Sequence, residues 1–190
     1  IKGRDTATDG MVYHGANTSA PETDALTLPE ASGTSDNAGW WQDTAPTSSS
    51  VYIGTHDRVN TDGKLFIAYC FASIQGYSKF GSYAGNGNAD GAFIYTGFKP
   101  AFVIQKQTNA DGEFWMMKDS TREPFNQTDA NVYPNAQNAE VDTNGIDLLS
   151  NGFKCRTAGA GSNADGATYI YIAFAESPFV SSEGVPTTAR

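Results

Sequence analysis

Histidine, cysteine and charge are all scarce in this chain of 190 residues, which contains two histidines and two cysteines. These four residues are scattered, so they supply too few ligands at suitable spacing for a zinc site. The chain also lacks a Gly-x-Ser-x-Gly elbow or another motif that activates a nucleophile. We therefore expect a protein that is not an enzyme and that uses no cofactor.

Charged residues make up 17% of the chain, compared with roughly 25% in an average soluble protein. The formal net charge is −9, and this acidic balance argues against nucleic acid and against an anionic membrane surface as partners. There is no run of about 20 apolar residues that could be inserted across a membrane. Carbohydrates, neutral surfaces and other proteins remain as partners.

An internal repeat is the strongest positive signal. Residues 60–72 read NTDGKLFIAYCFA, and residues 163–175 read NADGATYIYIAFA. The starting positions 60 and 163 differ by 103, which is too far for solenoid repeats of roughly 20–50 residues. This spacing predicts a duplicated domain, with a first repeat at 1–77, a second repeat at 78–177 and a C-terminal tail at 178–190.

Strand signals dominate the chain. Runs of β-branched and aromatic residues, such as 101–106 and 168–175, are separated by Gly and Pro. Asp-Gly pairs occur five times and indicate hairpin turns, because both residues tolerate positive φ. No window has a 3.6-residue apolar period with caps at both ends. We predict an all-β fold of two tandem antiparallel β-sandwiches of the jelly-roll type, with little helix.

The first repeat is expected to be incomplete at its N-terminus. Strand-like residues between 79 and 102 have no counterpart before Ile1, so we expect earlier residues or a neighbouring chain to complete the first sheet. In that sheet, Ile67–Phe71 is the expected equivalent of the strand at 168–175. Cys70 and Cys155 stand in apolar runs, which favours two free buried thiols over a disulfide.

Several segments also match a known family. Residues 76–87 (GYSKFGSYAGNG) and 91–103 (GAFIYTGFKPAFV) resemble a repeat module of structural proteins of marine bacteriophages, including cyanophages. Residues 146–154 (IDLLSNGFK) look like the middle motif of this module, and 43–47 and 179–186 also look like the family. The resemblance covers nearly the whole chain. It implies a tail-fibre or other virion protein that contacts further copies of itself and other virion proteins, and it carries over no catalytic residue.

Three aromatic residues are candidates for binding. Trp40 and Trp41 form a tandem pair beside Gln42 in a polar stretch, and Tyr133 lies in a similar stretch of the second repeat. Exposed aromatic rings beside amides are typical of carbohydrate recognition, because the rings stack on sugars while the amides bond hydroxyls. The alternative is that the tryptophans fill the core, since Ile146 stands near them in the repeat alignment.

Two long polar stretches, residues 15–50 and 119–145, occupy equivalent places in the two repeats. One interpretation makes them loops that carry binding specificity on a rigid scaffold. The other makes them edge strands and coil that cover the ends of the core, since structureless loops of this length are uncommon. The sequence favours neither.

A calcium loop is a further alternative. Asn86, Asn88 and Asp90 alternate before Gly91, as at the start of an EF-hand loop. The twelfth position is Gly97 rather than a bidentate Glu, so the strongest ligand is missing. Asx turns explain the same pattern without an ion, and we favour them.

Together these features favour a non-enzymatic virion structural protein, a tail-fibre or appendage domain whose exposed face binds a host-surface glycan or protein. Affinity would then be multiplied across copies. The alternative is a purely architectural subunit, such as a capsid decoration, adaptor or filament, held by inter-chain β contacts. A third possibility is a polysaccharide-degrading enzyme, which needs two carboxylates across a cleft. The available carboxylates are those of Glu140, Asp142, Asp147 and Glu176.

Overall fold

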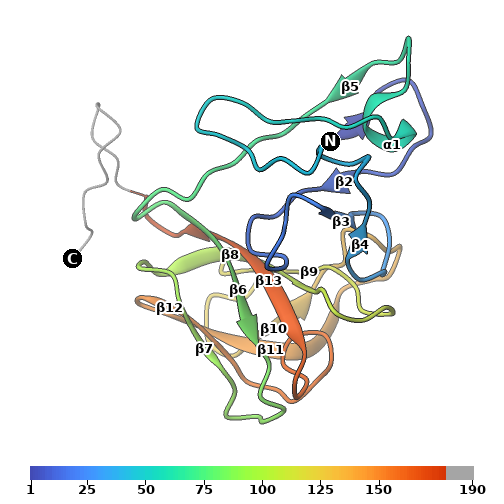
Figure 1. Cartoon of the computed structure of the whole chain (residues 1–190). Helices are drawn as coiled ribbons and strands as arrows, with labels where there is room; N and C mark the ends of the chain where they lie inside the picture. The colour runs from blue at the N-terminus through green and yellow to red at the C-terminus, as the bar shows by residue number, and fades with distance from the viewer. Residues whose placement is uncertain (179–190) are drawn as a thin grey trace.

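A computed structural model describes residues 1–178 of the chain, and it confirms the predicted all-β class (Figure 1). Strands β1–β13 account for nearly all of the regular structure in this range, and the short helix α1 (Asp57–Asn60) is the exception. From residue 179 on, the predicted C-terminal tail at 178–190 lies outside the described residues, as does the family-like segment 179–186.

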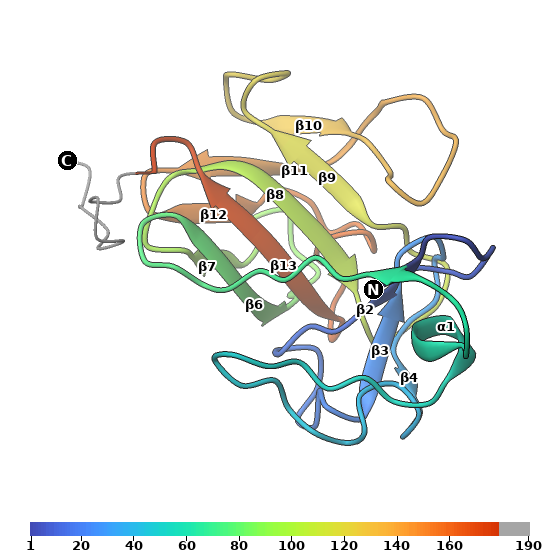
Figure 2. The same cartoon turned by 90° about the horizontal axis from the view of Figure 1, so that it is seen from above.

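Residues 78–177, called the sandwich below, form two stacked four-stranded antiparallel sheets (Figure 2). One sheet has the order β6-β13-β8-β9 and the other has the order β10-β11-β12-β7. The strands are β6 (Ser78–Ala84), β7 (Phe93–Tyr95), β8 (Pro100–Gln107), β9 (Met116–Asp119), β10 (Thr128–Asn131), β11 (Val141–Leu149), β12 (Gly152–Cys155) and β13 (Thr168–Ala175).

β13 is the central strand of its sheet, as its apolar sequence predicts. Tyr171 lies opposite Gly81 of β6 on one edge and opposite Gln105 of β8 on the other. A Cβ atom at Gly81 would come within 2.7 Å of the Tyr171 hydroxyl oxygen, so the tyrosine ring needs a glycine beside it. On both edges the backbone groups of β13 are therefore paired within the sheet.

The main core lies between the two sheets. Phe153 of β12 and Tyr171 of β13 meet edge to face, with ring centroids 5.5 Å apart. The buried apolar side chains of this cluster are Ile94, Phe98, Val103, Ile146, Leu148, Phe153, Cys155, Tyr171 and Ala173. Burying such side chains stabilises a fold by about 1.5–3 kcal/mol for each large residue.

A row of polar side chains crosses the same interior. The Gln105 amide donates to the Tyr83 hydroxyl at 2.6 Å, and the Lys118 ammonium approaches the Gln105 side-chain oxygen at 3.5 Å. Lys118 is 1% exposed, and its burial lowers its pKa from 10.5 to about 7. Burial also raises the pKa of the Cys155 thiol, from 9.0 to about 11.

Residues 1–77, called the N-terminal part, carry shorter strands. β1 (Lys2–Gly3) pairs with β5 (Phe66–Ile67), and a three-stranded sheet joins β2 (Met11–Val12), β3 (Asp24–Thr27) and β4 (Ser35–Asp36). α1 begins after His56, whose Nδ1 accepts a hydrogen bond from the Arg58 N–H. The buried apolar residues of this part are Met11, Ala25, Trp40, Trp41 and Val59.

The strand expected at Ile67–Phe71 is shorter than predicted. Regular pairing here ends at Ile67, and Cys70 is exposed, whereas Cys155 is buried as expected. The segment forms a shorter strand than predicted because it has fewer neighbouring strands. Within the described residues this segment pairs with β1 alone, whereas β13 pairs with two strands of seven or eight residues. Both cysteines are free.

The seam between the N-terminal part and the sandwich has a small core of its own. Trp115 is 1% exposed and packs with Leu26 of β3 and Ile170 of β13. Its indole N–H donates to the Thr27 carbonyl oxygen at 3.1 Å. One side chain thus joins the two parts by apolar contact and by a hydrogen bond.

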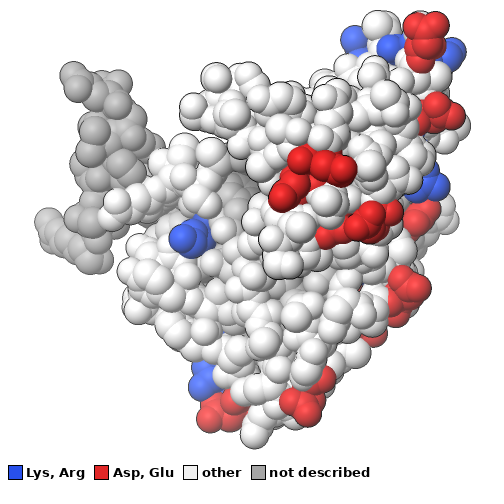
Figure 3. Space-filling model, viewed as in Figure 1, with Lys and Arg blue, Asp and Glu red and all other residues white. Residues whose placement is uncertain are grey.

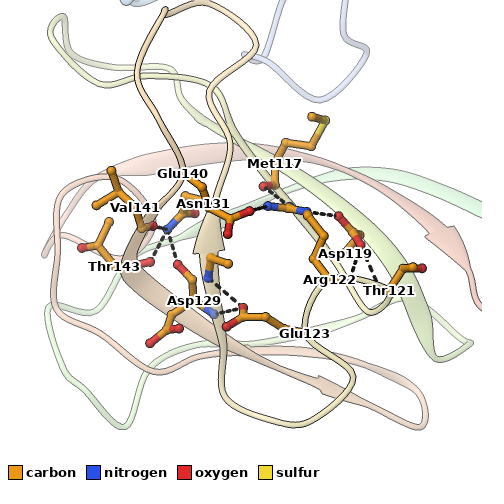
Figure 4. Close-up of polar contacts among 11 residues, drawn as sticks. Met117, Asp119, Thr121, Arg122, Glu123, Asp129, Asn131, Glu140, Val141 and Thr143 are labelled. Carbon is orange, nitrogen blue, oxygen red and sulfur yellow. Dashed lines mark hydrogen bonds and ion pairs between the residues drawn. The ribbon is translucent and has the colours of Figure 1, made fainter.

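The polar stretches contain strands and ordered contacts. β3 and β4 lie within residues 15–50, and β10 lies within 119–145. Arg122 binds the carboxylates of Asp119 and Glu140 (Figure 4). Edge strands and fixed connections, rather than free loops, thus account for part of both stretches.

The buried side chain of Asn131 in β10 stabilises the polar stretch at residues 119–145. The residue is 0% exposed, and its amide nitrogen donates to the carbonyl oxygens of Asp129 (2.8 Å), Val141 (3.4 Å) and Thr143. It therefore satisfies acceptors on both strands of the β10–β11 pair.

We expect Lys118→Met to remove a pH dependence of stability. Between about pH 7 and 10.5 the folded protein has released the Lys118 proton while the unfolded chain retains it, so stability rises with pH. The variant should be more stable than the wild type at pH 7, and the difference should shrink toward pH 9. Urea unfolding at several pH values measures it, with Lys79→Met on the exposed face of β6 as control. A wild type that loses stability between pH 7 and 9 would contradict the assignment.

Asn131→Ala should destabilise the protein by about 1–3 kcal/mol, because three strand carbonyl oxygens lose the buried amide that donates to them. Urea unfolding gives the magnitude. The matched control is Asn138→Ala, an exposed asparagine in the same connection, which we expect to be neutral. Equal effects of the two substitutions would show that the buried amide has no special role.

Candidate binding clefts at the seam

Two open clefts adjoin each other along the seam between the N-terminal part and the sandwich. Their volumes are about 500 and 420 Å³. Gly33, Thr34 and Asp111 line both clefts and form a ridge between them. We call them the first and the second cleft.

Backbone contacts across the seam fix this ridge. The Gly33 N–H donates to Oδ1 of Asp111 at 2.8 Å, and the Thr34 N–H donates to the Thr108 carbonyl oxygen at 2.8 Å. A Cβ atom at Gly33 would come within 2.9 Å of the Thr108 carbonyl oxygen, so the approach requires glycine. The ridge is therefore rigidly docked.

A buried amide lines the first cleft. Asn17 is 7% exposed, and its Oδ1 accepts a hydrogen bond from the Thr34 hydroxyl at 2.8 Å. This bond leaves the Asn17 Nδ2 group without a partner among the described residues. The hydroxyls of Thr108 and Thr168, 2.9 Å apart, lie on the same wall. The wall of this cleft thus contains two hydroxyls and an unpaired donor whose atom is itself buried.

The second cleft is lined by an indole edge. Trp40 is 5% exposed and stacks on His56, with ring centroids 4.0 Å apart. Its Nε1 has no hydrogen-bond partner in the described part of the chain. Arg58 lies at the same cleft, where Glu30 approaches it at 4.0 Å. An ion pair, an aromatic group and a buried unpaired donor therefore meet here.

Neutral polar groups dominate both clefts. Threonine and serine hydroxyls, amides and glycine backbone line them, with Glu30, Asp111 and Arg58 as the charged members. Figure 3 shows one face of the protein, most of it uncharged, with acidic side chains more numerous than basic ones. Such a lining suits a neutral, hydroxyl-rich ligand better than an anion.

The structure favours the core interpretation of the two tryptophans. Trp41 is 4% exposed, donates from Nε1 to the Asp24 carbonyl oxygen at 2.8 Å and packs edge-on against Tyr13. Neither indole presents a face to solvent, so neither can stack on a sugar ring. The core interpretation holds for both; Trp40 contributes to the lining of the second cleft, but its Nε1 atom is itself buried.

Tyr133 does not form a site together with Trp40 and Trp41. It is half-buried against Phe114, with ring centroids 5.2 Å apart, and it lines neither cleft. The three aromatic residues singled out from the sequence therefore do not form one site.

The loop that resembles a calcium site is a series of Asx turns. The Asn88 N–H donates to Asn86 Oδ1 at 3.1 Å, and the Asp90 N–H donates to Asn88 Oδ1 at 2.9 Å. The Asp90 carboxylate pairs with Lys154 at 2.5 Å, which lowers the pKa of this carboxyl group. Residues 1–178 contain no group of three His, Cys, Asp or Glu side chains placed to hold a metal ion.

The four carboxylates considered for glycoside cleavage lie outside both clefts. Glu140, Asp147 and Glu176 form ion pairs with Arg122, Arg156 and Lys99, respectively. Within the described range, no helix has the length and hydropathy needed to cross a bilayer.

Sequence reasoning missed the residues that build the clefts. Asn17, Thr108 and Thr168 come from three distant segments, and each looks like an ordinary loop or strand-end residue. The one available signal was the Asp111-Gly112 turn, which places the Asp111 carboxylate at the ridge.

One domain family, described as "Domain of unknown function (DUF7483)", matches residues 1–178. No curated protein and no solved structure matches the chain.

We expect Gly33→Ala to loosen the ridge and to cost about 1–3 kcal/mol, because the added methyl group meets backbone carbonyl oxygens. Chemical denaturation measures the loss. Gly15→Ala is the control, because a Cβ there would meet nothing nearer than 3.9 Å. A fully stable Gly33→Ala variant would contradict the docking described above.

Proposed function

This chain belongs to the DUF7483 family, and we propose that it is a non-enzymatic structural protein of a bacteriophage virion, in a tail fibre or another appendage. In this proposal the seam clefts form the face that binds neutral glycans on the host surface. Binding at each cleft is modest, and many copies on one particle multiply it.

The observation that carries the proposal is a pair of buried, unpaired donors, Asn17 Nδ2 and Trp40 Nε1, in residues that line adjoining clefts. Asn17 and Trp40 are each more than nine-tenths buried, and each keeps an N–H group without a partner among the described residues. A buried donor left unpaired costs about 1–3 kcal/mol. A sugar hydroxyl or ring oxygen that accepts from it, once a shift of the cleft wall uncovers the donor, would recover this energy on binding.

Other features support the virion setting. Residues 76–103 resemble a repeat module of phage structural proteins, and strand-rich, sparsely charged surfaces suit proteins outside the cell. The clefts contain no cluster of basic groups that would attract nucleic acid.

An architectural subunit is the second candidate function. A specific observation favours it, namely a run of exposed apolar side chains at 65–71 that has the sequence of a buried strand. The two roles are compatible, since a particle appendage must both assemble and bind.

The test is binding of the purified chain to an array of neutral and acidic bacterial-surface oligosaccharides, followed by affinity measurement on the best neutral ligand. Asn17→Asp keeps the acceptor for Thr34 but removes the free N–H donor, so we expect roughly tenfold weaker binding. Trp40→Phe removes the second donor and should weaken binding similarly.

Asn151→Asp provides the control, because it makes the same change of charge at an exposed loop of the sandwich. It should bind like the wild type. Thermal unfolding of each variant shows that it is folded. The glycan proposal fails if no neutral oligosaccharide binds, or if Asn17→Asp and Trp40→Phe bind as tightly as the control.

A further inference from the structure

A lysine and a glutamine are buried side by side inside the sandwich. In the β8–β9 pair, Val103 lies opposite Lys118 and Gln105 lies opposite Met116. Gln105 and Lys118 are therefore diagonal neighbours on the same face of the sheet. Each is 1% exposed, and the Lys118 nitrogen lies 3.5 Å from the Gln105 side-chain oxygen. An amine and an amide carbonyl thus meet in a space closed to solvent.

The buried lysine has no charged partner. Within residues 1–178, no carboxylate lies close enough to Lys118 to form an ion pair. Its hydrogen-bond partner there is the side-chain oxygen of Gln105. Because burial lowers the pKa of Lys118 to about 7, the neutral amine is well populated at neutral pH. A neutral amine can act as a nucleophile, whereas an ammonium ion cannot.

The nitrogen end of the same amide faces two proton donors. Gln105 Nε2 donates to the Tyr83 hydroxyl at 2.6 Å and lies 4.0 Å from the Cys155 sulfur. Burial raises the pKa of Cys155 to about 11 and holds the pKa of Tyr83 above its usual range, so both groups stay protonated at neutral pH. The amide therefore lies between a nucleophile at its oxygen end and proton donors at its nitrogen end.

We propose that Lys118 and Gln105 join in an isopeptide bond between β9 and β8. The Lys118 Nζ atom forms a bond to Gln105 Cδ, the Cδ–Nε2 bond breaks, and ammonia leaves. Nζ gives up one proton and the departing nitrogen gains one through the Tyr83 hydroxyl. One amide replaces another, so the reaction consumes no oxidant and no second substrate.

Burial favours this exchange and also sets its pace. The two strands hold the reacting groups together, and the exclusion of water protects the amide from hydrolysis. However, Lys118 is the donor that contacts the Gln105 side-chain oxygen, and no second donor contacts this atom within residues 1–178. The negative charge that develops there is therefore weakly stabilised. The bond should form slowly and accumulate after folding is complete.

The bond would fasten an edge of the sandwich. β9 is the last strand in the order β6-β13-β8-β9, so along this sheet it is joined to β8 alone. A covalent link between the two strands constrains the unfolded chain. We expect the linked protein to unfold at a higher urea concentration than the unlinked protein.

The surroundings of Lys118 determine how the reaction depends on pH. Burial is the main cause of its low pKa, and Arg122 acts in the same direction, whereas Cys155, Asp129 and Glu123 act in the opposite direction. Tyr83 is the further titratable group at Gln105. Because the amine carries a proton below about pH 7, the reaction should slow toward pH 6 and level off by pH 9.

The first experiment is intact-mass spectrometry of the denatured chain after incubation of the folded protein at about pH 6 and about pH 9. We expect a species lighter than the sequence by one ammonia, and it should accumulate faster at the higher pH. No glycan takes part in this measurement, so its failure and the failure of the proposed function are separate results.

Peptide mapping identifies the residues that are joined. Digestion uses trypsin together with a protease that cuts after glutamate. Trypsin does not cut after an acylated lysine, so the linked product should join residues 80–106 to residues 114–122. This assignment uses the wild-type chain and does not depend on the folding of any variant.

Lys118→Met and Gln105→Glu should both keep the full mass, because each lacks one of the two reacting groups. The matched controls are Lys79→Met and Gln75→Glu at exposed positions of the chain. They should lose ammonia at the wild-type rate. Circular dichroism shows whether each variant is folded.

The linked protein should also lose the pH dependence of stability that Lys118 confers, because an acylated lysine no longer titrates. The dependence expected above belongs to the unlinked chain. It is measured on freshly purified protein of full mass, and the aged, linked protein provides the comparison.

Three results would overturn the inference. The first is a wild type that keeps its full mass at both pH values. The second is an equal loss of ammonia from Lys118→Met, which would indicate ring closure at an Asn-Gly pair instead. The third is a branched peptide that joins Lys118 to a residue other than Gln105, such as the buried Asn131.

Discussion

Pairing of β13 on both of its edges is the constraint on which the rest of the structure depends. β6 and β8 satisfy its backbone groups, so its apolar side chains can be buried on both faces of the sheet. One face supplies Tyr171 to the core between the sheets, and the other supplies Ile170 to the seam. The Tyr171 carbonyl oxygen is also within 3.2 Å of the His14 Nε2 atom in the N-terminal part.

The seam follows from this strand and determines where binding groups meet. Trp115 docks β3 against β13, and the Gly33 ridge docks against the turn after β8. Between these two contacts the surfaces of the N-terminal part and the sandwich do not pack against each other, which leaves the two clefts. Asn17 Nδ2 and Trp40 Nε1 stay buried and unpaired because a hydrogen bond to Oδ1 holds Asn17 and stacking on His56 holds Trp40. Packing, not an accumulation of charge, creates the candidate site.

A comparison of β13 with the Leu65–Phe71 segment shows that the number of neighbouring strands determines how far a strand is buried. Two sequences of the same kind are buried where two strands flank them and exposed where one does.

The sequence by itself determined the all-β class, the interior position of the strand at 168–175 and three of the five predicted Asp-Gly turns, at Gly63, Gly112 and Gly166, because alternation, β-branched residues and positive φ act locally. It also marked residues 60–72 as related to 163–175. Tertiary structure alone decided that Trp40 and Trp41 are buried, that Cys70 is exposed and that Asn17, Thr108 and Asp111 line one cleft. The physical reason is that burial depends on which strands are present beside a segment. A cleft depends on how two separately folded surfaces fail to close, and neither is encoded in the local pattern of residues.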